Sequence, residues 1–145
     1  MSRLGFLWMA LLLLFQGSCS LFSVTEDELW VHEIVQDAPP IRDLLSECEW
    51  ALLDADLPPG DRDEAAARVT SGWKTVLHPF SSGGRRYQGL LEIEATDEIG
   101  VYRISARYRV QANTEIHKPL DASLAKWESM EDDPQRAKIL LHHLV

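Results

Sequence analysis

Residues able to do acid–base or metal chemistry are scattered along this 145-residue chain. The five histidines are His32, His78, His117, His142 and His143. Adjacent residues on a helix point about 100° apart, so His142 and His143 cannot form the i, i+4 pair that binds zinc. His78 and His117 fall in predicted loops with no cysteine or carboxylate at ligand spacing. This pattern favours solvated histidines over a metal site.

Cys48 could act as a nucleophile with a distant histidine. Its position in an apolar helical stripe favours a small buried hydrophobic residue instead. Carboxylates are abundant, but no two have a spacing typical of an acid–base pair. The sequence therefore predicts no catalytic residues, no metal site and no cofactor.

The segment from Ser81 to Arg86 reads Ser-Ser-Gly-Gly-Arg-Arg. Glycines free backbone N–H groups and arginines bind phosphate through two donors, so Arg85 and Arg86 are candidate anion contacts. The segment lacks the lysine and the following helix of a phosphate-binding P-loop. A plain connection between strands is the competing interpretation.

The composition is that of an acidic globular protein. Fourteen Lys and Arg residues oppose 23 Asp and Glu residues, giving a formal net charge of −9, and 46% of residues are hydrophobic. Such a chain repels nucleic acid unless its basic residues cluster. Arg103, Arg107 and Arg109 form a row on one predicted strand face with no aromatic residues interleaved. The sequence therefore disfavours nucleic-acid binding.

The N-terminus has the order of an export signal, so residues 1–18 are predicted to be a signal peptide. Arg3 precedes an apolar run from Leu4 to Phe15, which is shorter than the ~20 residues that span a bilayer. Gly17, Ser18 and Cys19 follow, and they resemble the lipobox of bacterial lipoproteins. The resemblance implies that Cys19 is acylated, becomes the first residue and anchors the chain in the membrane.

Two neighbouring residues qualify this resemblance. Gln16 stands where a lipobox has an aliphatic residue, so ordinary cleavage after Ser18, which releases a soluble exported protein, stays open. Ser20 stands where lipoproteins retained at the inner membrane often have Asp. By that resemblance, the outer membrane is the favoured destination.

The mature chain divides into a tether over residues 19–39 and one domain over 40–145. A helix is predicted over 41–57, followed by strands over 68–77, 87–96 and 101–113. Asp121 is predicted to begin a short helix, and Asp133-Pro134 a second one. The expected fold is α+β: an N-terminal helix, a three-stranded antiparallel meander and a C-terminal helical segment.

The pattern of the last two strands predicts their register. Apolar residues must face apolar residues across the hairpin, which places Glu94 opposite Arg103 around the loop from Asp97 to Gly100. The same register sets four further pairs: Ala95 with Tyr102, Ile93 with Ile104, Leu91 with Ala106, and Gly89 with Tyr108.

A second apolar ridge on the predicted helix carries Trp50, Leu53 and Leu57. It lies opposite the main stripe, where the sheet cannot cover it. The Leu29-Trp30-Val31 segment of the tether could cover it, as could the C-terminal helix. Alternatively, the ridge is a docking surface for a protein partner, because Trp with flanking Leu is typical of a binding hot spot.

The order of these features resembles the helix-grip module of BamC-type lipoproteins of the outer-membrane assembly machinery. The resemblance covers about residues 40–113 and rests on the order of the elements and on the strand that carries Thr70 and Trp73. It implies an accessory role with no catalytic residues. We expect a membrane-anchored, non-catalytic interaction lipoprotein of the bacterial envelope with an envelope protein as partner. The alternative is a binding module for a lipid or an anionic envelope ligand.

Overall fold

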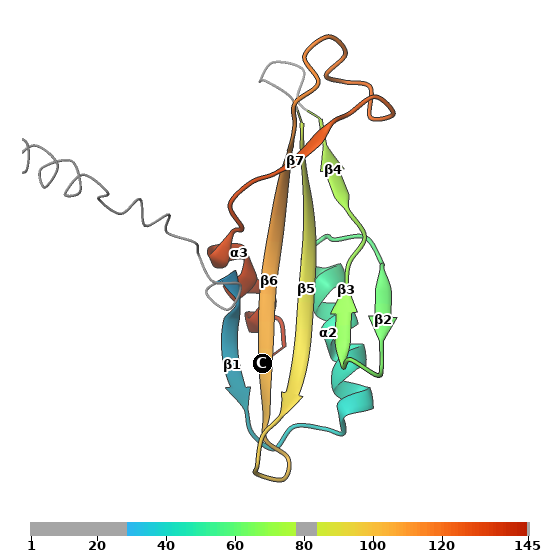
Figure 1. Cartoon of the computed structure of the whole chain (residues 1–145). Helices are drawn as coiled ribbons and strands as arrows, with labels where there is room; N and C mark the ends of the chain where they lie inside the picture. The colour runs from blue at the N-terminus through green and yellow to red at the C-terminus, as the bar shows by residue number, and fades with distance from the viewer. Residues whose placement is uncertain (1–28, 78–83, 145) are drawn as a thin grey trace, which may run out of the picture.

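The computed structural model describes residues 29–77 and 84–144, which form one antiparallel sheet and two helices (Figure 1). In chain order the elements are β1 (Val31–Val35), α2 (Ile41–Asp54), β2 (Asp61–Asp63), β3 (Arg68–Thr70), β4 (Lys74–Val76), β5 (Arg85–Ala95), β6 (Tyr102–Asn113), β7 (Trp127–Ser129) and α3 (Pro134–His142). The predicted signal peptide and Cys19 lie outside the described residues.

The long hairpin of β5 and β6 forms the centre of the sheet. The strand order is β1-β6-β5-β3-β2, with β4 also paired to β5 and β7 also paired to β6. Each long strand therefore has two short partners, one near each end of the hairpin, as Figure 1 shows. Strands of 11 and 12 residues can accommodate this because each short strand has only 3 or 5.

The predicted register of this hairpin is confirmed. Glu94 lies opposite Arg103, and all four apolar-row pairs are found as expected. Ile104 is buried while Arg103 is exposed. The alternating pattern specified the register because a shift by one residue would have turned every apolar side chain toward solvent.

The predicted order of helix, three-stranded meander and helix is wrong. The sheet has seven strands, and the first of them, β1, precedes α2. This strand lies in the range expected to be a tether, and it pairs with β6 from Val31 opposite Ala106 to Val35 opposite Tyr102. Its pairing fills the edge that β6 leaves open.

The strand expected over 68–77 is two strands with a break between them. Val69 in β3 is buried in the core, and Ser71 still exchanges hydrogen bonds with Gly89. At Gly72 the backbone N–H instead donates to the carbonyl of Pro58 at 2.9 Å. The chain leaves the ladder there and rejoins the sheet as β4, farther along β5.

The short helix expected after Asp121 is also absent. Asp121 accepts a hydrogen bond from the Ser123 N–H at 3.0 Å, which closes a turn. Trp127, expected on that helix, lies in β7 opposite Asn113. The Asn113 side chain accepts from the Lys126 N–H at 3.0 Å and so positions this strand against β6.

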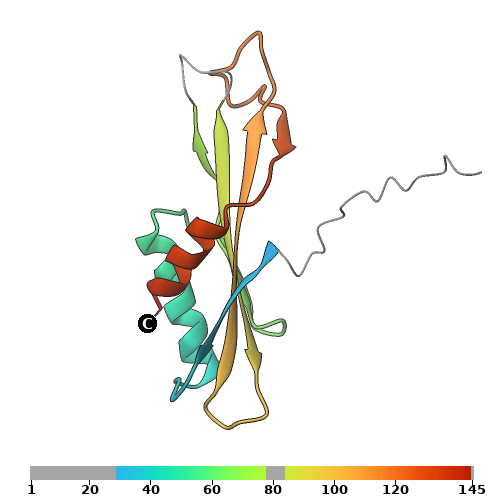
Figure 2. The same ribbon diagram turned by 90° about the vertical axis from the view of Figure 1, so that its left-hand side faces the viewer.

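The two helices, α2 and α3, cover the same face of the sheet, as Figure 2 shows with the sheet nearly edge-on. The helix α2 ends at Asp54 rather than at 57, because Asp56 adopts a φ of 58° and the Leu57 N–H bonds back to Leu52. The start predicted for α3 is confirmed: Asp133 accepts from the N–H groups of Gln135 and Arg136. Within the described residues, neither helix is long and apolar enough to cross a membrane.

Candidate functional site

The groups singled out for catalytic chemistry lie apart from one another. Cys48 is fully buried in the core, where burial, followed by the charges of Glu47 and Glu49, raises its pKa to about 12. A thiol in that environment is a poor nucleophile. Within residues 29–77 and 84–144, no group of three His, Cys, Asp or Glu residues could hold a metal ion.

The histidines are spread over the surface. His32 on β1 is exposed and lies 2.7 Å from the Ser105 hydroxyl on β6. His117, His142 and His143 are exposed in a loop and at the end of α3. His78 lies outside the described residues.

The sheet face away from the helices carries an arrangement of arginine and tryptophan side chains. Arg86 from β5 and Arg109 from β6 lie next to Trp73, which precedes β4. Trp127 in β7 lies against Arg86, and Trp30 lies within 6.0 Å of Arg107. The expectation that no aromatic residues accompany these arginines is therefore wrong. The absence of aromatic residues no longer argues against a nucleic-acid ligand.

Arg86 is held between two indole rings. Its guanidinium carbon lies 4.4 Å from the ring centre of Trp73 and 4.8 Å from that of Trp127. Its Nε donates to the side-chain oxygen of Gln111 at 2.7 Å. The two indole contacts and this hydrogen bond restrict the orientation of the guanidinium group.

Arg109 lies beside this stack. Its guanidinium carbon is 5.8 Å from the ring centre of Trp73, and it donates to Gln88 at 3.4 Å. Because Arg86 pairs with Gln111 and Gln88 pairs with Arg109, the two arginines are diagonal neighbours on the hairpin. We call Arg86, Arg109, Trp73 and Trp127 the Arg–Trp cluster.

The structure places Arg85 and Arg86, the predicted pair, on opposite faces of β5. Consecutive residues of a strand point to opposite faces, so only Arg86 belongs to the Arg–Trp cluster, while Arg85 is exposed at the start of β5. Residues 78–83 of the predicted loop lie outside the described residues. The neighbour of Arg86 in the cluster is Arg109, from the opposite strand.

The Arg–Trp cluster differs in its charge balance from the other arginines on the sheet face away from the helices. Arg68 forms an ion pair with Glu92, Arg103 with Glu94, and Arg107 with Asp132. Among the described residues, Arg86 and Arg109 form no ion pair with a carboxylate. Partial burial, followed by the positive charge of Arg109, lowers the pKa of Arg86.

A second candidate site lies beside the predicted Trp50 ridge. Trp50 is 66% exposed and Leu53 39% exposed, whereas Leu57 is only 2% exposed because it packs into the core next to Gly89. Neither predicted cover reaches Trp50: Val31 is in the sheet, and Leu140 of α3 is fully buried in the core. The ridge is therefore reduced to Trp50 and Leu53.

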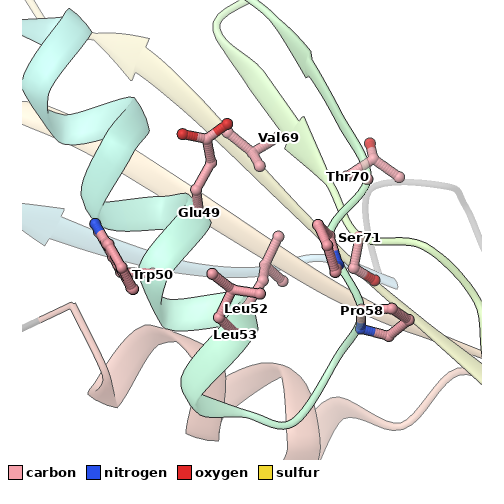
Figure 3. Close-up of a pocket in the computed structure, with 10 residues that line it drawn as sticks. Glu49, Trp50, Leu52, Leu53, Pro58, Val69, Thr70 and Ser71 are labelled. Atoms are coloured by element: carbon pink, nitrogen blue, oxygen red, sulfur yellow. The ribbon is translucent and has the colours of Figure 1, made fainter.

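These two residues border a pocket of about 250 Å³ between α2 and β3. Figure 3 shows Glu49, Trp50 and Leu53 on the helix side, and Pro58, Thr70 and Ser71 on the other side. Glu49 pairs with Arg62 at 3.2 Å. We call this site the Trp50 pocket.

The described residues form a small protein with an antiparallel sheet, two helices on one face, the Arg–Trp cluster on the other face and the Trp50 pocket beside α2. No family model matches the chain, and no curated protein matches it. One similar solved structure is a TBP-like protein from Parabacteroides distasonis, with 15% identity and a TM-score of 0.35 over 69% of this chain. The match spans 64% of the length of that protein, and at this TM-score it carries no argument about function.

The sequence does not reveal the Arg–Trp cluster, because the unbroken strand predicted over 68–77 puts Trp73 on the same face as Val69. Both have odd numbers, so an unbroken strand would put both on the core face. The available signal was Gly72, because a glycine inside a strand often marks a break or a close backbone approach. A Cβ atom at this position would lie 2.8 Å from the carbonyl oxygen of Pro59.

Proposed function

We propose that this protein is a lipid-anchored, non-catalytic interaction protein of the bacterial envelope that docks a protein partner at the Trp50 pocket. The observation that carries the docking step is Trp50 itself, a tryptophan with 66% of its surface exposed beside a pocket. Large aromatic side chains that anchor in or beside pockets dominate the binding free energy of many protein interfaces.

The shape of the pocket favours a single apolar anchor from the partner. A volume of about 250 Å³ has room for one large side chain. Leu52, Leu53 and Val69 supply apolar lining, while Thr70 and Ser71 lie on the strand side. Transfer of the partner's apolar side chain from water to this lining provides the favourable free energy of binding.

The charges around the pocket favour a partner with basic flanks. Glu47 and Asp54, on the same helix as Trp50, are exposed and form no ion pair within the described residues. With the net charge of −9, they would attract a partner segment that carries Lys or Arg beside its apolar anchor. The occupant we propose is such a segment.

The anchoring step rests on the sequence. Cys19 follows an apolar run and two small residues, and acylation there would hold the domain at a membrane through about ten intervening residues before Trp30. The acidic balance argues against electrostatic attraction to anionic lipid as the anchor.

The docking step is tested with synthetic peptides. A peptide with a central Leu or Phe flanked by Lys is titrated into the 15N-labelled domain, and the backbone N–H signals of Leu53, Thr70 and Ser71, which line the pocket, are followed by NMR. We expect Trp50→Ala to weaken binding at least about ten-fold, because it removes the anchor contact. The fold should persist, because Trp50 lies mainly in solvent.

The matched control is Ile139→Ala, which removes a 52% exposed apolar side chain from α3. It should leave binding unchanged. The same peptide with Glu in place of Lys should bind more weakly. Equal binding by the Trp50→Ala and unsubstituted proteins would contradict the proposed docking surface.

A further inference from the structure

On the face of the sheet away from the helices, Arg86 and Arg109 are the two described arginines that form no ion pair with a described carboxylate. The chain has 23 acidic residues for 14 basic ones, so carboxylates are in excess. The other three arginines on this face, Arg68, Arg103 and Arg107, each form an ion pair with a carboxylate. Two adjacent unbalanced guanidinium groups repel each other, and a bound anion would relieve that repulsion.

The nearest acidic residues do not remove this imbalance. Arg109 shares a hollow of about 230 Å³ with Gln111, Glu131 and Asp132. Asp132 is engaged by Arg107, and within the described residues Glu131 forms no ion pair. Within the described residues, the Arg–Trp cluster therefore has two positively charged side chains and no ion pair to a carboxylate.

The cluster is also prepared to donate hydrogen bonds. The Nε of Arg86 is engaged by Gln111, and its two terminal nitrogens have no hydrogen bond to the described residues. Both nitrogens keep some exposure to solvent, so water or a ligand can reach them. The two indole contacts restrict the orientation of the guanidinium group, which lowers the entropy lost when an anion binds.

We infer that Arg86 and Arg109 together bind a phosphate group at the open face of the sheet. A phosphate presents three or four oxygens in different directions, so one group can accept from two guanidinium groups that are not coplanar. This site is independent of the proposed docking at the Trp50 pocket, since it lies on the opposite face of the sheet. The phosphate belongs to a soluble phosphate ester or to a lipid headgroup.

The binding step is tested with inorganic phosphate. The purified chain is titrated with sodium phosphate at constant ionic strength, and the arginine Nε–H and indole N–H signals are followed by NMR. The signals of Arg86, Arg109 and Trp73 are expected to move together along one binding curve. Arg109→Gln is expected to weaken binding at least about ten-fold, and Arg109→Lys to weaken it less, because the charge is retained without the planar fork.

The control is Arg103→Gln, which removes the same charge from the same face of β6. Arg103 already pairs with Glu94, so its loss should leave phosphate binding unchanged within about two-fold. Equal weakening by the Arg103 and Arg109 substitutions would show non-specific attraction and overturn the site. So would signals that respond to sodium chloride as strongly as to phosphate, which would leave the Arg–Trp cluster a purely structural stack.

Vesicles distinguish the two sources of the phosphate. Binding is compared for phosphatidylcholine vesicles with and without phosphatidic acid, which carries a phosphate monoester. Tighter binding to the phosphatidic acid vesicles than to free phosphate, lost in Arg109→Gln, identifies a lipid headgroup. Binding of free phosphate without vesicle binding identifies a soluble phosphate ester, and binding of neither overturns the proposal.

Discussion

A Cβ atom added to Gly89 would lie 2.6 Å from Cδ2 of Leu52. The glycine in β5 therefore leaves room for Leu52 of α2 to pack directly against the strand. The same atom would be 2.8 Å from Cδ1 of Leu57 and 3.2 Å from Cδ1 of Leu140 in α3. Side chains from both helices and from the segment after α2 therefore meet β5 at this glycine. A single missing side chain allows the apolar residues of three segments to pack against one strand.

We predict that Gly89→Ala destabilises the fold by about 1 to 3 kcal/mol, and Gly89→Val by more. The added atoms overfill a core in which Leu52 and Leu140 have no room to withdraw. The free energy of unfolding is measured with urea. Glu94→Ala, at the exposed end of the same strand, serves as the control and should change stability by less than about 1 kcal/mol.

The register of the hairpin predicts opposite outcomes for two adjacent residues. Ile104→Asp should unfold the domain, because it places a charge in the core beside Ile93. Arg103→Ala should cost under about 1 kcal/mol, because its ion pair with Glu94 is exposed to solvent. Circular dichroism and urea unfolding measure both effects. Similar losses from the two substitutions would contradict the register.

Cys48 predicts a pH dependence of stability. Its pKa is raised from its ordinary value of 9.0 to about 12 in the folded chain, so above pH 9 the unfolded chain releases this proton and the folded chain retains it. Stability therefore falls as pH rises, and this residue should contribute a loss of about 1 kcal/mol between pH 7.5 and pH 10.

The measurement is urea unfolding at the two pH values, with Cys48→Ala as the reference. The substituted protein should lose about 1 kcal/mol less than the unsubstituted protein over this interval. The thiol of Cys48 should also resist alkylation until the chain unfolds. Rapid alkylation of Cys48 in the native protein would be inconsistent with its burial.

The lipobox-like sequence predicts an acylated N-terminus at Cys19. Cys19→Ala should release the protein from the membrane fraction into the soluble fraction, because no other anchor is predicted. Mass spectrometry of the purified protein should find acyl chains on Cys19 and no residue before it. An unmodified Cys19, or cleavage elsewhere, would favour the soluble exported protein.

The features that the sequence determined by itself are those encoded over short stretches of chain. The pairing of Ile93 with Ile104 follows from alternating polarity on two strands joined by a short loop. The start of α3 follows from Asp133, whose side chain bonds to N–H groups two and three residues later. Neither feature depends on a distant part of the chain.

The features that only the tertiary structure decided involve short strands and distant partners. Val31–Val35 was expected to belong to a tether because five residues carry too weak a period to be recognised, yet it pairs with β6 because that strand leaves an open edge. Likewise, the face of Trp73 depends on the break at Gly72, and the place of Trp127 depends on Asn113. These segments have no strong preference of their own, so the backbone groups and side chains already exposed by the hairpin determine where they pair and which residues share the Arg–Trp cluster.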